Sequence, residues 1–409
     1  MHANKSTVTT HPTLRRSLGL TLLTLYGVGI TVGAGIYVLI GAVTRHAGMM
    51  TPLAFLLAAI VMGLTVASYA ELCTRFPVAA GEAAYVRAAF GRRWVSTLTG
   101  LIMIGTGVIA SATVAIGSAG YIGQFTDLPR PMVITAVIIT VAIVVAWGVL
   151  ESVLLASIFT VVEVGGLLLI IAAAWRADLG IIPALTAWPS FEFAQWNGLL
   201  FASLLAFFAF TGFEDLTNMI EEAHVPERNV PTAMALTLGI TTFLYVVIAA
   251  IAVTAISPKE LAGSSAPLSL VFGRVAGMSA IAISLIAIVS TLNTIIAQMT
   301  MSIRVVYGLA KQGDLPAKFG QVHVKTATPL LATGIIMLLT LGFALIVPFE
   351  RLAEWTSVAT LVVFALVNLA LIKIRVAEKR PSRAIIHVPL VIPVLGLTTC
   401  IVMICTAVT

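Results

Sequence analysis

The chain has 409 residues, of which 10% are charged and 59% hydrophobic, and its mean hydropathy is +1.08. Soluble domains carry about 25% charged residues, so this composition excludes a soluble globular fold and indicates a chain that lies mainly in lipid. The apolar runs are long and do not alternate, which excludes a β-barrel. The three cysteines form no CxxC pair, so neither a disulfide framework nor a metal site is expected.

Eleven apolar segments are long enough to cross a membrane as helices. They cover 18–43, 51–73, 94–123, 131–150, 152–175, 197–221, 231–256, 279–309, 328–347, 353–374 and 386–408, and short amphipathic helices are expected at 77–91 and 258–276. With a cytoplasmic N-terminus, 17 of the 23 Lys and Arg residues fall on the cytoplasmic side. This bias predicts a multi-pass protein of the plasma (cell inner) membrane with its N-terminus inside and its C-terminus outside.

The first span contains five glycines in GVGITVGAGIYVLIG, residues 27–41. Each glycine costs about 1 kcal/mol relative to alanine inside a helix, so the sequence needs a reason for them. One reason is close helix packing, because Gly29 and Gly33 form a GxxxG motif. The other is a broken helix, in which unwound backbone offers free N–H and C=O groups to a ligand at mid-membrane.

The sixth span favours the broken helix. It reads FFAFTGFEDLTNMIEEAHVPERNVP, residues 207–231, with Gly212 at mid-depth and two acidic residues soon after it. Two inverted repeats of five helices would place the first and sixth spans in corresponding positions. Both candidate breaks fall where such a repeat requires them.

Together with the span pattern, three stretches resemble the amino acid–polyamine–organocation transporter superfamily, and within it cationic-amino-acid-transporter-like bacterial permeases. They are the glycine-rich first span, residues 207–233, and STLNTIIAQMTMSIRVVYGLAKQGDLP at 290–316. The resemblance implies an all-α, LeuT-like fold with five-plus-five inverted repeats and broken helices 1 and 6. The chain would divide into a cytoplasmic tail (1–17), repeat 1 (18–175), repeat 2 (197–374) and an additional helix 11 (386–409). Relatives usually have twelve or more spans.

The resemblance also implies a free amino acid as the ligand. Its carboxylate would bind N–H groups at 33–35, because the N-terminus of a half-helix carries partial positive charge. Its ammonium would bind carbonyls at the ends of the preceding half-helices, and two phenylalanines would be walls or gates unless they belong to the core. The expected binding residues are Ile30, Thr31, Gly33, Ala34, Gly35, Phe208, Phe210, Thr211 and Gly212. Small residues in the third span favour neutral side chains, and cationic ones remain open because acidic groups lie nearby.

Three acidic residues inside the predicted spans are candidates for proton coupling or gating, since carboxylates in lipid are costly. Glu163 lies in the fifth span, where similar transporters often carry a lysine that replaces a sodium ion. We expect it to carry a proton or to bind a cation, the alternative being a permanently neutral acid bonded to a carbonyl. Glu214 is expected to act in gating or pH response. Asp215 either does the same, caps the helix or forms a hydrogen bond to another span.

Ser290 and Thr291 in the eighth span form a possible sodium site, with Asn293 beside them, although such side chains often only bond neighbouring helices. Glu71, Glu82 and Arg75 are expected to form pairs at the membrane interface. The predicted partners are therefore an amino acid, a proton or sodium ion, and membrane lipid. No cofactor, metal or nucleic acid is expected, and the sequence leaves the oligomeric state open.

The preferred function is a proton-coupled secondary transporter that works by alternating access. A sodium-coupled symporter and an amino acid exchanger are the alternatives within that class. A channel is less favoured, because channels are usually symmetric oligomers with pore-lining rings. An enzyme would need a catalytic cluster such as HExxH, and an ATP-driven pump would need GxxxxGK[ST]; the sequence contains neither.

Overall fold

The structure is a computed structural model that describes residues 18–77, 81–148, 153–326, 328–378 and 386–407. The predicted cytoplasmic tail, 1–17, lies outside these residues, as do the basic residues of 379–385. Within the described part every regular element is a helix, apart from an isolated bridge between Leu18 and Ala223. Seven of the described helical stretches are long and apolar enough to span a membrane, and five shorter helices are also apolar. The chain is therefore a polytopic all-helical membrane protein, as predicted.

Helical structure occupies each of the eleven predicted spans. The first comprises α1 (Leu20–Val32) and α2 (Gly35–Ala47), and the sixth comprises α9 (Phe193–Phe208) and the 3₁₀ helix η2 (Phe213–Glu222). The other spans are α3 (Thr51–Arg75), α5 (Arg93–Ile122), α6 (Arg130–Ala146), α7 (Val153–Arg176), α10 (Pro226–Ala255), α13 (Ile281–Lys311), α14 (Leu330–Ile346), α15 (Phe349–Ala377) and α16 (Val391–Thr406). The connections contain η1 (Gly48–Met50), α4 (Gly81–Phe90), α8 (Ile182–Leu185), α11 (Pro258–Gly263), α12 (Pro267–Ala276) and η3 (Ala317–Gly320).

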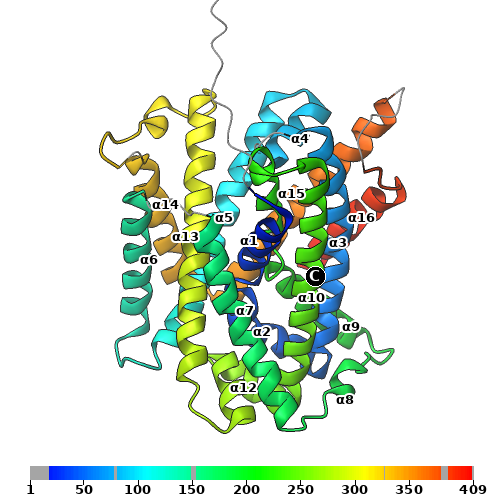
Figure 1. Ribbon diagram of the computed structural model, residues 1–409, viewed down its shortest axis with the longest axis vertical. Coiled ribbons are helices and arrows are strands. Elements are labelled where there is room, and N and C mark those ends of the chain that lie inside the picture. Colours follow the sequence, from blue (N-terminus) through cyan, green and yellow to red (C-terminus); the bar gives the residue numbers. More distant parts are fainter. Residues whose placement is uncertain (1–17, 78–80, 149–152, 327, 379–385, 408–409) are drawn as a thin grey trace, which may run out of the picture.

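The interrupted first and sixth spans occupy the centre of the bundle (Figure 1). Helix α2 is buried along almost its whole length, and the long helices around it include α5 packed along α13, α3 along α10, and α15 along α16. One side of the bundle carries α4 and the opposite side carries α8 and α12 (Figure 1). These are called the α4 side and the α12 side below.

The glycines of the first span serve both of the purposes that the sequence allowed. A Cβ on Gly29 would lie 1.9 Å from Thr160 Oγ1 of α7, so this glycine permits close helix packing. Gly33 ends α1 with non-helical angles (φ 16°, ψ −138°), and α2 starts two residues later. The GxxxG motif thus has one glycine at a helix contact and the other at a helix break.

The two interruptions cross in direct contact, and each presents a glycine to the other. A Cβ on Gly35 would lie 2.6 Å from Ala209 Cα, and one on Gly212 would lie 3.2 Å from Ile30 O. Gly212 has φ +118°, a conformation that glycine adopts without strain and other residues rarely adopt. The backbone chains approach this closely only because no side chain stands between them.

Candidate functional site

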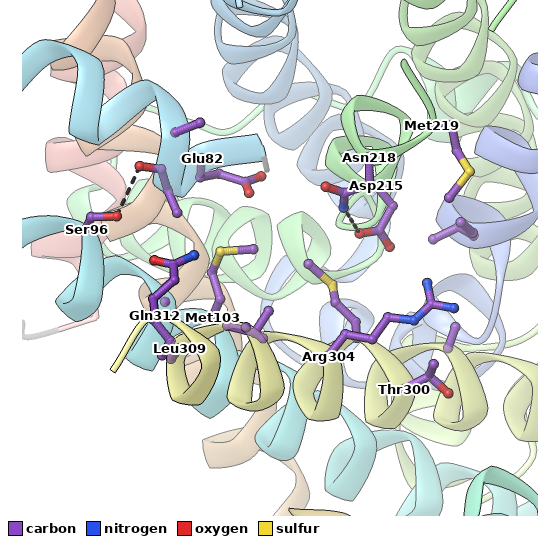
Figure 2. A pocket seen from close by; sticks show the side chains of 18 of the residues that line it. Glu82, Ser96, Met103, Asp215, Asn218, Met219, Thr300, Arg304, Leu309 and Gln312 are labelled. Carbon is purple, nitrogen blue, oxygen red and sulfur yellow. Dashed lines mark hydrogen bonds between the residues drawn. The ribbon is translucent and has the colours of Figure 1, made fainter. Parts of the chain in front are cut away.

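A cavity of about 500 Å³ opens into the bundle from the α4 side and ends near the interruption of α1. Figure 2 shows Asp215, Asn218 and Met219 on one wall and Arg304 with Thr300 on the wall formed by α13. Ile30 lies at the inner end, while Arg304 and Arg87 are exposed to solvent. We call this cavity the vestibule. Among the described residues, Ile30 is the one predicted binding residue that lines the vestibule, while Thr211 lines a smaller neighbouring cavity and residues 33–35 line neither.

The N–H groups at the α1 interruption are engaged by protein atoms in this state. Gly33 N–H donates to Gly29 O (3.0 Å), and Ala34 N–H donates to Thr294 Oγ1 of α13 (2.9 Å). A ligand carboxylate would have to replace the Thr294 hydroxyl to reach Ala34 N–H. Thr294 is a polar contact of the site that the sequence analysis did not identify.

The main-chain carbonyls at the two interruptions accept hydrogen bonds from one tyrosine. The Tyr245 hydroxyl of α10 lies 2.7 Å from Thr31 O and 2.8 Å from Ala209 O, so it joins the end of α1 to the end of α9. A hydroxyl has one proton and donates to only one of these oxygens at a time, which leaves the other able to accept from a ligand ammonium. The Phe208 carbonyl, by contrast, accepts from the Thr211 hydroxyl (2.7 Å).

Neither predicted aromatic gate is among the residues that line the vestibule in the described part of the chain. Phe210 is fully buried and stacks edge-on against Tyr245, with ring centroids 4.9 Å apart. Phe208 is also buried, at 5% exposure. In this state both rings belong to the packed interior, and a gating role for either stays a prediction.

The two acidic residues after the sixth-span break face different surroundings. The Glu214 carboxylate accepts the Gly212 N–H (2.8 Å) just before η2 begins. Asp215 lines the vestibule, where Asn218 donates to it at 3.5 Å (Figure 2). Roles of Glu214 and Asp215 in gating or proton coupling stay predictions.

Glu163 is fully buried and approaches α2 and α13. Its carboxylate lies 3.4 Å from Asn293 Nδ2, and its main-chain carbonyl accepts the Tyr37 hydroxyl (2.7 Å). Thr291 of the possible sodium site turns to α5, where it donates to Ser118 Oγ (2.9 Å), while the Ser290 hydroxyl has no hydrogen-bond partner among the described residues. The structure therefore places Asn293, rather than Thr291, against Glu163.

On the α12 side, polar contacts hold α2 against its neighbours. Arg45 at the end of α2 forms an ion pair with Glu350 of α15 (2.8 Å) and donates to Ala262 O of α11 (3.1 Å). The Tyr121 hydroxyl of α5 donates to Tyr37 O (2.6 Å). Arg45 and Glu350 also line a separate cavity of about 350 Å³ on this side, whose lining includes none of the predicted binding residues among those described.

Comparison with known proteins decides the family. The model of the family described as amino acid permease matches residues 18–409, which is nearly the whole chain. The chain belongs to the amino acid permease family. It is therefore a member of the amino acid–polyamine–organocation superfamily, as the sequence motifs indicated, and a transporter rather than an enzyme.

Individual relatives of the permease are distant. The branched-chain amino acid permease BcaP of Bacillus subtilis is 27% identical over 392 residues, which cover 90% of this chain and 82% of the relative. The vacuolar cationic amino acid transporter 4 of Arabidopsis thaliana is 28% identical over 88% of this chain, which spans only 64% of that relative. A methylthioribose transporter of Bacillus subtilis is 26% identical over 95% of this chain and 87% of its own length.

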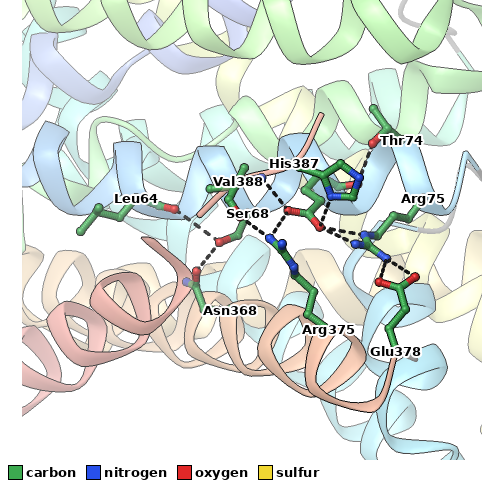
Figure 3. A network of polar contacts seen from close by, with 10 residues as sticks. Leu64, Ser68, Thr74, Arg75, Asn368, Arg375, Glu378, His387 and Val388 are labelled. Atoms are coloured by element: carbon green, nitrogen blue, oxygen red, sulfur yellow. Dashed lines mark hydrogen bonds and ion pairs between the residues drawn. The ribbon is translucent and has the colours of Figure 1, made fainter. Parts of the chain in front are cut away.

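A separate polar network includes Arg75, Arg375 and Val388 (Figure 3). Glu71 of α3 is fully buried and accepts from Arg75 (2.6 Å), from Arg375 of α15 (3.2 Å) and from Val388 N–H (2.9 Å). The predicted Glu71–Arg75 pair is thus confirmed. The network joins α3 and α15 to the segment before α16, and its charges are satisfied by one another.

Replacing Tyr245 with phenylalanine is expected to destabilise the permease by about 1–3 kcal/mol, because two buried main-chain carbonyls lose their shared donor. The ring remains in place, so packing against Phe210 is retained. Thermal unfolding of the purified protein measures the effect. Tyr307→Phe is the control, since Tyr307 lies on α13 beside Lys311 and away from the interruptions. Equal unfolding temperatures for Tyr245→Phe and the unchanged protein would contradict the bridging role.

Proposed function

We propose that the permease moves amino acids across the plasma membrane by alternating access, with its N-terminus in the cytoplasm. The α4 side is then the cytoplasmic side, and the charge bias of the sequence supports this orientation. The observation that carries the proposal is the vestibule, which ends where the two interrupted helices cross. With Arg45 and Glu350 tying α2 to α15 on the α12 side and the vestibule on the α4 side, this arrangement would correspond to an inward-open state.

We propose that the fold consists of two inverted five-helix repeats, 18–175 and 197–374, with α16 as an additional helix. The reciprocal contact at the centre supports it. Each interrupted helix contributes a glycine that lies against the backbone of the other, namely Gly35 against Ala209 and Gly212 against Ile30. Interrupted helices in corresponding positions of two repeats are the usual substrate site of transporters built in this way.

The ligand would bind through its main-chain groups at this crossing. The N–H groups of 33–35 would hold the carboxylate, and the carbonyls that Tyr245 now bridges would hold the ammonium. Tyr245 would donate to one of these carbonyls while the ammonium donates to the other, so its buried hydroxyl would stay paired. Thr294 would yield the Ala34 N–H to the carboxylate and keep its bond to Ser290 O.

Neutral, apolar amino acids are the substrates that the vestibule favours. Met103, Met219 and Met301 line it near Ile30, and methionine gives an adaptable apolar surface. One relative, the branched-chain amino acid permease of Bacillus subtilis, agrees with this choice. The cationic amino acid transporters among the relatives keep basic substrates as the second candidate.

Proton coupling is the mechanism that we propose, with Glu163 as the carrier. A carboxylate that is fully buried within lipid is costly unless a proton or a cation neutralises it. Sodium coupling, with Ser290 and Thr291 as ligands, is the alternative, and the direction of the Thr291 hydroxyl toward Ser118 makes it weaker. Exchange of one amino acid for another is compatible with the same site.

Uptake by purified permease in lipid vesicles tests the proposal. We expect saturable uptake of radiolabelled leucine, increased when the side from which leucine enters is made acidic and unaffected by replacing sodium with choline. A thermal-shift panel of the twenty amino acids identifies the ligand independently of coupling. Uptake that requires sodium would favour the alternative, and flux that does not saturate would indicate a channel.

A further inference from the structure

Two acidic residues from different elements line a second, smaller cavity next to the vestibule. Glu82 belongs to α4 and Glu214 to η2, and the remaining walls come from α5, α13 and α15. Glu82, Met103 and Met301 line both spaces, so they form the partition between this inner cavity and the vestibule. Glu82 therefore lies between Glu214 and the vestibule, which opens to solvent on the α4 side.

Neither carboxylate has an ion pair with a basic side chain in the described part of the chain. Glu82 is 2% exposed, and its Oε1 accepts the Tyr69 hydroxyl at 2.9 Å. Glu214 accepts the Gly212 N–H given above. The expected pairing of Glu82 with Arg75 is wrong, because Arg75 turns to Glu71 and Glu378 instead.

An unpartnered hydroxyl at the same cavity points to a bound species. Thr360 of α15 lines the inner cavity, is 4% exposed, and its Oγ1 has no hydrogen-bond partner among the described residues. Buried hydroxyls normally have a partner. The inner cavity has a volume of about 30 Å³, which suits about two water molecules and is too small for an amino acid side chain.

Two buried carboxylates without a basic partner cannot both be ionised at little cost, since like charges in a poorly solvated site repel. We propose that Glu82 and Glu214 share one proton, which reaches them from the vestibule by way of Glu82 and water in the inner cavity. This inference rests on the proposed proton coupling and adds a second proton site to Glu163. Burial also raises the pKa of the Glu82 carboxyl, which favours its protonated form.

Other titratable and charged groups surround Glu82 and Glu214. They include Tyr69 on α3, Asp215 and Glu222 on η2, Arg304 on α13, Lys373 on α15, and Tyr85 and Arg87 on α4 itself, and Asp215 directly follows Glu214 in the chain. Loss of the shared proton to the vestibule would set two negative charges against each other. That repulsion would disfavour the present arrangement of α4 and η2, so proton release would favour departure from the inward-open state.

Infrared spectroscopy of the purified permease during a pH titration tests the shared proton without any substrate. We expect a protonated-carboxyl band at neutral pH, part of which disappears in the double variant Glu82→Gln/Glu214→Gln but persists in either single variant, because the one proton then stays on the remaining buried acid. Two independently protonated acids predict instead that each single variant removes about half of that part, and that result would overturn the proposal. Glu227→Gln, at a half-buried carboxylate at the start of α10, should leave the band unchanged.

Tyr69→Phe gives a second measurement that does not remove either acid. The Tyr69 hydroxyl donates to Glu82 and thereby stabilises its ionised form, so its loss should raise the titration midpoint by roughly one pH unit, the equivalent of one hydrogen bond. An unchanged midpoint would overturn the proposal. A band that sodium, rather than pH, abolishes would also overturn it and assign the pair to a metal cation. Because no transport is measured, these outcomes are independent of the uptake assay.

Discussion

Gly35→Ala is expected to abolish amino acid uptake and to destabilise the permease by about 1–3 kcal/mol. The added Cβ would lie 2.6 Å from Ala209 Cα and 2.8 Å from Ala209 Cβ, so the crossing of the two interrupted helices would have to widen. The main chain of Ala209 cannot move away from the added Cβ as easily as the end of a flexible side chain could. A wider crossing would also separate Thr31 O from Ala209 O, which Tyr245 now bridges.

Gly239→Ala is the matched control for Gly35→Ala. Gly239 lies on the exposed face of α10, and a Cβ there would meet nothing within 4 Å. Alanine should be favoured over glycine by about 1 kcal/mol in this helix. Opposite shifts in unfolding temperature are therefore expected for the two variants. A Gly35→Ala protein with unchanged stability and uptake would show that the crossing is not as tight as described.

The interruptions could be predicted from the sequence because their causes are local. The glycines at 27–41 and Gly212 weaken any helix that contains them. They lie in corresponding spans of the two halves of the chain, which indicated that these helices are interrupted. The helical spans were predictable for a similar reason, since the long apolar runs specify helices in lipid without reference to their neighbours. Both features depend on residues that are close together in the sequence.

The partners of the site could not be predicted, because they come from distant parts of the chain. Thr294 reaches Ala34 across 260 residues, and Tyr245 reaches Thr31 across 214. A possible signal for Tyr245 was its place in the middle of an apolar run, where a buried hydroxyl needs a hydrogen-bond partner.

The acidic residues near α4 illustrate the same limit. Glu71 and Arg75 are four residues apart on one helix, so their ion pair could be expected from the spacing alone. The position of Glu82 depends instead on how α4 packs against η2. Charge and spacing along the sequence do not specify that tertiary contact. Its pairing was consequently predicted wrongly, and its place beside Glu214 became visible only in the structure.

Glu163→Gln is expected to lower proton-driven uptake at least about tenfold, equivalent to roughly 1.4 kcal/mol or more, while exchange of internal for external substrate persists. Glutamine has nearly the same shape and can still bond Asn293, but it cannot release a proton. The Tyr37 hydroxyl donates to the main-chain carbonyl of residue 163, so this hydrogen bond does not depend on the side chain that is replaced. The contacts that hold α2 on the α12 side should therefore be retained. Leucine uptake into vesicles, with and without an imposed pH gradient, separates the two activities.

Ser290→Ala distinguishes the proton from the sodium mechanism in the same assay. If Glu163 carries a proton, removal of the Ser290 hydroxyl should change uptake little, because that hydroxyl bonds no other described residue. If Glu163 and Ser290 bind sodium together, both substitutions should weaken the response of uptake to sodium. Wild-type pH dependence in Glu163→Gln would remove Glu163 from coupling altogether. The Glu82–Glu214 pair would then be the remaining buried acidic site from which a proton could be released to the vestibule.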